Sequence, residues 1–178
     1  MGRNLFIQGR CGMLRGRWAA IALILAFGLA PGPVEAGQLV GKPSVVDGDT
    51  LDFSGQAVDL YGIDAPEVEQ NCHADGQSWP CGREARWAAI NRISPHWVTC
   101  VERGRGADGS MTAVCYLAGV GQYDVAAWLV ERGWALADRR VSQDYVTQER
   151  AAQAAGAGLW RGRFVPPWDW RQGKRLSP

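Results

Sequence analysis

The chain has 178 residues, of which 47% are apolar and 21% are charged, and this ordinary globular composition excludes an intrinsically disordered protein. Its length suits one domain with a hydrophobic core and is rarely sufficient for two. The formal net charge is +1, and it falls to −2 without residues 1–36, because four of the 19 basic residues and one of the 18 acidic residues lie there. A protein that binds nucleic acid through excess positive charge alone is therefore excluded.

Residues 1–36 have the pattern of a secretory signal peptide. Four arginines precede an apolar run over residues 18–30, and small residues follow it up to Ala36. As a helix this run spans only about 20 Å, short of the roughly 30 Å hydrocarbon layer of a bilayer. We expect cleavage near Ala36 and export to the periplasm or the medium, with no stable membrane association afterwards; an uncleaved anchor is the alternative. Met13 is an alternative start that leaves this prediction unchanged.

The cysteines agree with export. Four remain after the predicted cleavage, Cys72, Cys81, Cys100 and Cys115, and an even number fits an oxidising compartment. Of the three pairings that four cysteines allow, Cys72–Cys81 and Cys100–Cys115 are favoured, because each pair brackets a short segment with turn residues inside. A metal site at Cys72-His73 is the competing interpretation, but it lacks the C-x-x-C spacing of zinc sites.

Short β-rich runs separated by turns occupy residues 38–63, and they predict three consecutive antiparallel strands. A polar loop over residues 67–82 follows, and its two cysteines should hold it in place. Residues 83–93 predict a helix. Its apolar stripe consists of Ala85, Ala88, Ala89 and Ile93.

Residues 96–104 and 111–119 flank a turn and predict a hairpin whose strands carry Cys100 and Cys115. Helices are predicted over residues 123–133, where Val125 and Leu129 share a face and Gly133 is a stop, and over residues 144–160. Three strands, a helix, two strands and two helices indicate an α+β, mainly β fold, a five-stranded OB-fold barrel with about three helices.

This domain is expected to cover residues 37–160, followed by a C-terminal tail over residues 161–178. The tail interleaves basic and aromatic side chains: Arg161, Arg163, Phe164, Trp168, Trp170, Arg171, Lys174 and Arg175. Such a mixture can stack bases and hold phosphates. The other interpretation is an arm that its tryptophans pack against the domain.

Residues 45–67, VVDGDTLDFSGQAVDLYGIDAPE, contain six carboxylates and no Lys, Arg or His. Gly48 permits a tight bend in DGD, and Pro66 stiffens DAPE just before Glu67. Several oxygens converging at one end of a barrel would suit a hard cation such as calcium. The alternative is that these acids are turn residues, since Asp-Gly and Asp-Ala-Pro favour turns.

The words VVDGDTL, LYGIDAPE, GQYDVAAWLVERGWA, DY…QERAA and GLW, in this order, resemble the staphylococcal nuclease (thermonuclease) family over roughly Leu39 to Trp160. The resemblance implies a five-stranded barrel with three helices. It also implies a calcium-dependent phosphodiesterase that acts on DNA and RNA, in which a glutamate activates water and two arginines hold the phosphate.

Carried over by position, Asp49 and Asp64 match the metal-binding aspartates, with Asp47 close to the ion. Ala65 stands where the family commonly has Thr, but this position gives a main-chain carbonyl, so Ala can serve. Glu67 matches the general base. This half of the family site is present in the sequence.

The two arginine positions differ from the family. The first falls on Asp59 and the second on Ser110. Neither side chain replaces the two-pronged, permanent charge of a guanidinium, and Asp59 would repel a phosphate. Arg103 and Arg105, in the same hairpin, are candidate substitutes for phosphate contact. Two functions follow: a monomeric, weak or altered nuclease, or a non-catalytic OB-fold binding module that retains a cation site.

Overall fold

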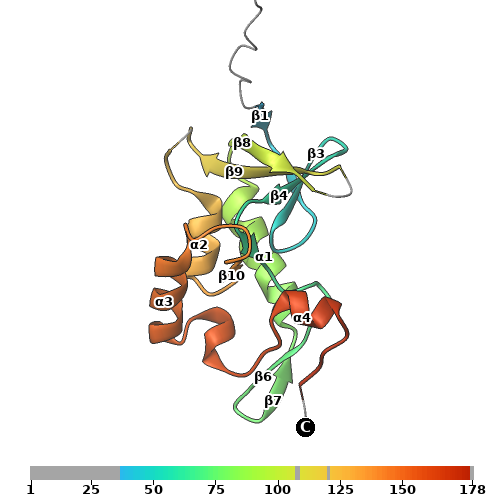
Figure 1. Cartoon of the computed structure of the whole chain (residues 1–178), viewed down its shortest axis with the longest axis vertical. Helices are drawn as coiled ribbons and strands as arrows, with labels where there is room; N and C mark the ends of the chain where they lie inside the picture. The colour runs from blue at the N-terminus through green and yellow to red at the C-terminus, as the bar shows by residue number, and fades with distance from the viewer. Residues whose placement is uncertain (1–36, 107–108, 120, 177–178) are drawn as a thin grey trace, which may run out of the picture. The chain divides into compact units, whose positions relative to one another are not determined.

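The computed structural model describes residues 37–106, 109–119 and 121–176, so the predicted signal peptide lies outside the described residues (Figure 1). The strands are β1 (Gln38–Gly41), β2 (Ser44–Val45), β3 (Thr50–Phe53), β4 (Gln56–Leu60), β5 (Ile63–Asp64), β6 (Cys72–Ala74), β7 (Gln77–Trp79), β8 (Val98–Arg105), β9 (Met111–Leu117) and β10 (Leu136–Ala137). The helices are α1 (Cys81–Ile93), α2 (Val125–Glu131), α3 (Val146–Ala155), the 3₁₀ turn η1 (Gly158–Arg161) and α4 (Pro167–Arg171). In this part of the chain no helix is both long and apolar enough to span a bilayer.

The main sheet has the strand order β1-β8-β9-β4-β3-β2, which places β1 and β2 at opposite edges. Only Lys42 and Pro43 separate these two strands in the chain. The three steps from Gly41 to Ser44 span at most about 11 Å, whereas a flat six-stranded sheet would hold its edges about 24 Å apart. The sheet therefore curls until its edges approach each other. Counted as one bent strand, β1 and β2 give the five strands of the predicted OB-like, mainly β fold, which is confirmed.

Side-chain alternation decides what faces the barrel interior. On β4, Val58 and Leu60 are buried at 0% and 3% exposure, and Asp59 between them is half-buried on the other face. Leu51 of β3, opposite Val58 in the ladder, completes this part of the core. An acidic residue in the middle of a core strand is therefore directed away from the apolar core.

The predicted helices are present with different limits. On α1 the buried stripe contains Ala85, Ala89 and Ile93, as expected, whereas Ala88, which was also predicted in it, is only half-buried. The last predicted helix, residues 144–160, is instead α3 followed by η1. Gly156 causes the break: it has φ 60°, and its left-handed conformation ends α3 at Ala155.

Four short elements were missed from the sequence. The polar loop contains the hairpin β6–β7, a short strand β10 pairs with β5, and the tail contains α4. Each of them has five or fewer residues, too few for a periodic pattern to be recognised. All four contribute to positioning the acidic segment or the tail.

The predicted disulfides are confirmed. Cys72 is bonded to Cys81 and Cys100 to Cys115. Cys100 and Cys115 lie directly opposite each other in the β8–β9 ladder. The Cys72–Cys81 bond joins β6 to the first residue of α1, which excludes Cys72 as a thiolate metal ligand.

The tail folds back onto the domain. The backbone of Arg163 exchanges two hydrogen bonds with His73 of β6, at 2.7 and 2.9 Å, and the buried Gln70 side chain donates to the Val165 carbonyl at 2.7 Å. Phe164 and Trp168 pack against a small second core. The buried residues of that core are Cys72, Cys81, Leu136 and Leu159. This geometry supports the packed-arm interpretation of the tail.

We predict that Gly82→Ala destabilises the protein by about 1–3 kcal/mol. A Cβ at Gly82 would lie 1.6 Å from the Glu67 carbonyl oxygen, so α1 and the segment carrying Glu67 would have to move apart. Urea unfolding measures the change. Gly104→Ala is the matched control, because its Cβ would meet nothing within 4 Å, and it should change the free energy of unfolding by less than about 0.5 kcal/mol. Equal effects of the two substitutions would contradict this account.

Candidate acidic site

The DGD word forms a tight turn between β2 and β3. Asp47 Oδ1 accepts hydrogen bonds from the backbone N–H groups of Asp49 (3.2 Å) and Thr50 (2.7 Å), as a turn-forming aspartate does. Gly48 is required by a close approach: a Cβ there would lie 2.6 Å from the Cβ of Ala65. The turn interpretation is thus correct for Asp47, and the turn presents Asp49.

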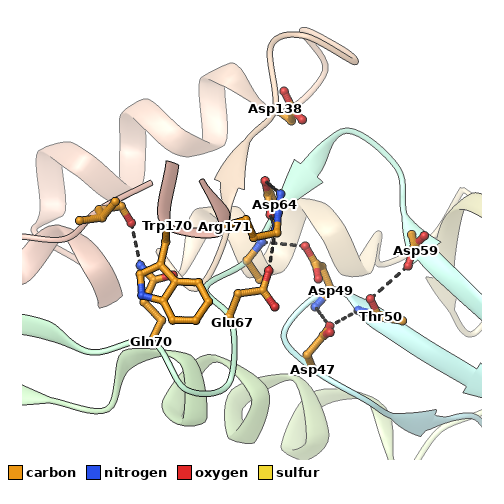
Figure 2. A network of polar contacts seen from close by, with 12 residues as sticks. Asp47, Asp49, Thr50, Asp59, Asp64, Glu67, Gln70, Asp138, Trp170 and Arg171 are labelled. Carbon is orange, nitrogen blue, oxygen red and sulfur yellow. Dashed lines mark hydrogen bonds and ion pairs between the residues drawn. The ribbon is translucent and has the colours of Figure 1, made fainter. Parts of the chain in front are cut away.

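The DAPE word lies against this turn. Asp49 Oδ2 accepts a hydrogen bond from the Ala65 N–H at 2.7 Å, which joins two segments that are 16 residues apart. Asp64 is the last residue of β5, which β10 pairs through Leu136. Asp64 is only 5% exposed, so its carboxylate is held at the pocket wall. Figure 2 shows Asp47, Asp49, Asp64 and Glu67 around one region.

These residues line a pocket of about 440 Å³. Its walls carry six carboxylates and a single basic side chain. The lining residues are Asp47, Asp49, Thr50, Asp59, Leu60, Ile63, Asp64, Glu67, Asp138 and Arg171. With this excess of acids the pocket attracts cations and repels phosphates.

Asp59 and Ser110, the two positions that the resemblance assigns to arginines, lie side by side at this pocket. The Ser110 hydroxyl donates to Asp59 Oδ2 at 2.5 Å, and the Thr50 hydroxyl donates to Asp59 Oδ1 at 3.1 Å. Both carboxylate oxygens of Asp59 therefore accept hydrogen bonds from neutral donors. The two positions form a bonded pair and supply no positive charge.

The basic side chain in the pocket is Arg171, from the end of α4. It donates to both oxygens of Asp64, at 2.9 and 2.5 Å, and to Glu67 Oε1 at 2.7 Å. Figure 2 shows the guanidinium between the two carboxylates. Arg171 follows Asp64 by 107 residues and Glu67 by 104, so the tail brings in the charge that the acidic segment lacks.

A second arginine stands at the rim. Arg140 binds Asp138 through two side-chain hydrogen bonds of 2.8 and 2.7 Å, and it lies 3.7 Å from Asp64 Oδ2. Its guanidinium also stacks over the Trp168 ring at 4.9 Å. Arg140 is thus tied to Asp138 and to the tail.

The electrostatics follow from these contacts. Burial, together with the charges of Asp47 and Asp64, raises the pKa of Asp49 well above its ordinary value of 3.8. Burial also raises the pKa of Asp64, although Arg171 opposes this shift.

Hydrogen bonds from Arg140 lower the pKa of Asp138. Hydrogen bonds to Asp64 and Glu67 raise the pKa of Arg171, so its charge is permanent.

A divalent cation does not fit the donors as they are arranged. Across residues 37–106, 109–119 and 121–176, no three His, Cys, Asp or Glu side chains form a group that could hold a metal ion. Both oxygens of Asp64 accept from Arg171, and one oxygen of Asp49 accepts the Ala65 N–H. The carboxylates gather around one pocket, but a guanidinium stands among them.

The candidate substitutes Arg103 and Arg105 lie elsewhere. Arg105, at the end of β8, pairs with Glu102 at 2.8 Å, and Arg103 is exposed at the irregularity in the β8–β9 ladder. Neither belongs to the described lining of the pocket. Arg171, which does line it, and Arg140, which lies 3.7 Å from Asp64 Oδ2, were not selected from the sequence as site residues.

The fold and the site define a class, an OB-like barrel of the nuclease type with an acidic pocket at its edge. The family model described as staphylococcal nuclease homologue matches residues 57–162, and the chain belongs to this family. The matched range includes Asp59, Asp64, Glu67 and Ser110, whereas Asp49 precedes it and Arg171 follows it.

One relative is the succinoglycan biosynthesis protein ExoI of Rhizobium meliloti (strain 1021). It is 36% identical over 129 residues, which are 70% of this chain and 66% of that protein. The chain thus spans slightly less than two thirds of the length of this relative. The name of the relative refers to succinoglycan biosynthesis and does not mention nucleic acid.

We predict that Asp49→Asn raises Tm at pH 7 by about 2–4 °C, the shift that about 1 kcal/mol causes in a domain of this size. The raised pKa means that the native state keeps the Asp49 proton where the unfolded chain has lost it, so stability falls as pH rises from 3.8 through the raised value. Asn cannot ionise and can still accept the Ala65 N–H. The advantage of the variant should therefore increase with pH, as thermal melts between pH 4 and 8 would reveal.

The control for this experiment is Glu69→Gln, which removes an exposed carboxylate outside the pocket lining. It should leave Tm nearly unchanged at every pH. A variant Asp49→Asn that is less stable than the original protein at pH 7 would mean that the ionised carboxylate stabilises the fold.

Proposed function

We propose that this protein is an exported, monomeric staphylococcal nuclease homologue that has lost detectable phosphodiester hydrolysis, and that its acidic pocket binds cations. The proposal rests on one observation: Asp59 and Ser110, the residues that the resemblance assigns to the arginine positions, hydrogen-bond to each other at 2.5 Å. A phosphodiester that entered the pocket would meet the Asp59 carboxylate and the Ser110 hydroxyl where the resemblance implies guanidinium groups. The two disulfides support an oxidising location, and the periplasm or the medium is part of the proposal.

The energetic cost of replacing two arginines favours a complete loss of hydrolysis over a small reduction in its rate. One donor that stabilises developing negative charge is typically worth about 2.7–4 kcal/mol, a factor of roughly 10² to 10³ in rate. Removing two therefore costs roughly 10⁴ or more if the effects combine. Asp59 adds repulsion to this loss, because its carboxylate faces the same pocket. Arg171 does not offset the loss while both oxygens of Asp64 and one of Glu67 hold its guanidinium.

A calcium-dependent nuclease acting on DNA or RNA is the second candidate. The observation in its favour is that Asp49, Asp64 and Glu67 surround one pocket. In this candidate Asp49, Asp64 and the Ala65 carbonyl would hold calcium, and Glu67 would be the general base. It requires Arg171 to leave Asp64 and Glu67 before either carboxylate can act.

The deciding experiment incubates the protein with denatured DNA and with RNA, in calcium or in chelator, beside the variant Glu67→Gln. We expect the two proteins to show the same residual cleavage, independent of calcium. The comparison removes contaminating nucleases from the result, because such an activity would be equal in both preparations. Calcium-dependent cleavage that Glu67→Gln abolishes would establish the second candidate and contradict the proposal.

A gain of activity tests the assignment of the two arginine positions. The double variant Asp59→Arg/Ser110→Arg, made together with Arg171→Gln so that the pocket carboxylates are released, should cleave denatured DNA at least about 10²-fold faster than Arg171→Gln alone. Initial rates in calcium give the ratio. No gain in a folded triple variant would mean that Asp59 and Ser110 do not stand in the phosphate-binding positions.

A further inference from the structure

Several independent contacts fix the C-terminal arm, residues 163–175, to the domain and so hold Arg171 in the acidic pocket. Its start exchanges two backbone hydrogen bonds with β6, and Gln70, which is completely buried, donates to the carbonyl of Val165. Trp168 packs on the small second core beneath Arg140. The arm is thus part of the fold up to α4, whose last residue is Arg171.

The guanidinium of Arg171 binds Asp64, one of the two aspartates that the resemblance assigns to the metal, and also Glu67. A hard cation takes carboxylate oxygens as ligands, and both oxygens of Asp64 already accept from Arg171. Glu67, the candidate base, accepts from the same guanidinium. An ion and the guanidinium therefore cannot both bind these oxygens in the arrangement seen here.

The charge balance explains why a guanidinium is stable in this position. Asp64 is almost fully buried, and a buried carboxylate is costly unless a partner compensates its charge. The flat, forked donors of arginine match a carboxylate with two parallel hydrogen bonds. The Arg171 side chain is 47% exposed, so it lies at the mouth of the pocket, within reach of competing ions from solvent.

We propose that Arg171 is the built-in counter-ion of the acidic pocket and that it competes with divalent cations for Asp64 and Glu67. The inference rests on the proposed function, since it identifies the cation that the pocket holds when no external cation is bound. The arm therefore sets the concentration of divalent cation that is needed to occupy the pocket, because an ion enters only when it displaces Arg171 from the two carboxylates. Access of cations to the pocket is then controlled by the C-terminal arm.

The test compares calcium binding by the original protein, Arg171→Gln and Arg175→Gln, using isothermal titration and the calcium-induced shift in Tm. Arg175 is the matched control, since it lies on the same arm and stacks over Trp170 at 4.3 Å, with no contact to the pocket carboxylates among the described interactions. We expect Arg171→Gln to have a lower Tm in chelator and to bind calcium at least about tenfold more tightly. Arg175→Gln should behave like the original protein.

Two further variants make the result specific. Asp64→Asn added to Arg171→Gln should abolish the gain in calcium affinity. Arg171→Lys keeps a charge but replaces the fork with a single ammonium, so its calcium affinity should lie between those of the original protein and Arg171→Gln. Arg171→Lys also serves as the test if Arg171→Gln does not fold.

Equal calcium affinity in the original protein and the folded Arg171 variants would overturn the inference. A gain in Arg175→Gln equal to that in Arg171→Gln would also overturn it, because it would reflect loosening of the whole arm. These binding measurements do not depend on cleavage. Nuclease activity in the original protein would contradict the proposed function and leave the competition to be decided by affinity alone.

Discussion

The organisation of the site depends on one electrostatic constraint: the carboxylates clustered at the barrel edge require a compensating positive charge. The DGD and DAPE words are brought together by the hydrogen bond between Asp49 and the Ala65 N–H. Burial there, together with the charges of Asp47 and Asp64, raises the pKa of Asp49, so positive charge nearby stabilises the ionised acids. Arg171 supplies this compensation from more than 100 residues away along the chain. The path of the tail, the second core and the Cys72–Cys81 bond all contribute to placing that arginine.

The family fold and the chemistry of the pocket depend on different parts of this structure. The chain belongs to the staphylococcal nuclease homologues, and the acidic residues that the resemblance assigns to the family site line one pocket. Asp59 and Ser110 hydrogen-bond to each other there and supply no positive charge. A fold can be retained while its chemistry changes, because the barrel is stabilised by its apolar interior and the pocket lies outside that interior. Asp59 illustrates this independence, since it lies between two core residues of β4 and faces away from them.

Stability and cation binding are linked in this pocket. Asp49 and Asp64 have raised pKa values, which means that their ionised forms are held at a cost. Any bound cation, whether a guanidinium from the chain or an ion from solvent, lowers that cost. The arm therefore has a structural role and a binding role through one side chain.

The sequence alone determined the barrel, the disulfide pairs, most helix positions and the acidic segment, because these follow from local patterns: alternation, helical stripes, turn residues and spacing. It also showed that residues 45–67 contain six carboxylates and no basic side chain. The basic side chain that compensates these carboxylates could not be predicted, since the tail contains several basic residues and no local pattern distinguishes Arg171 from Arg175. Only the tertiary structure made that choice, because short elements such as β6, β7 and α4 are stabilised by packing and disulfide contacts with distant residues, and these contacts decide where the end of α4 lies.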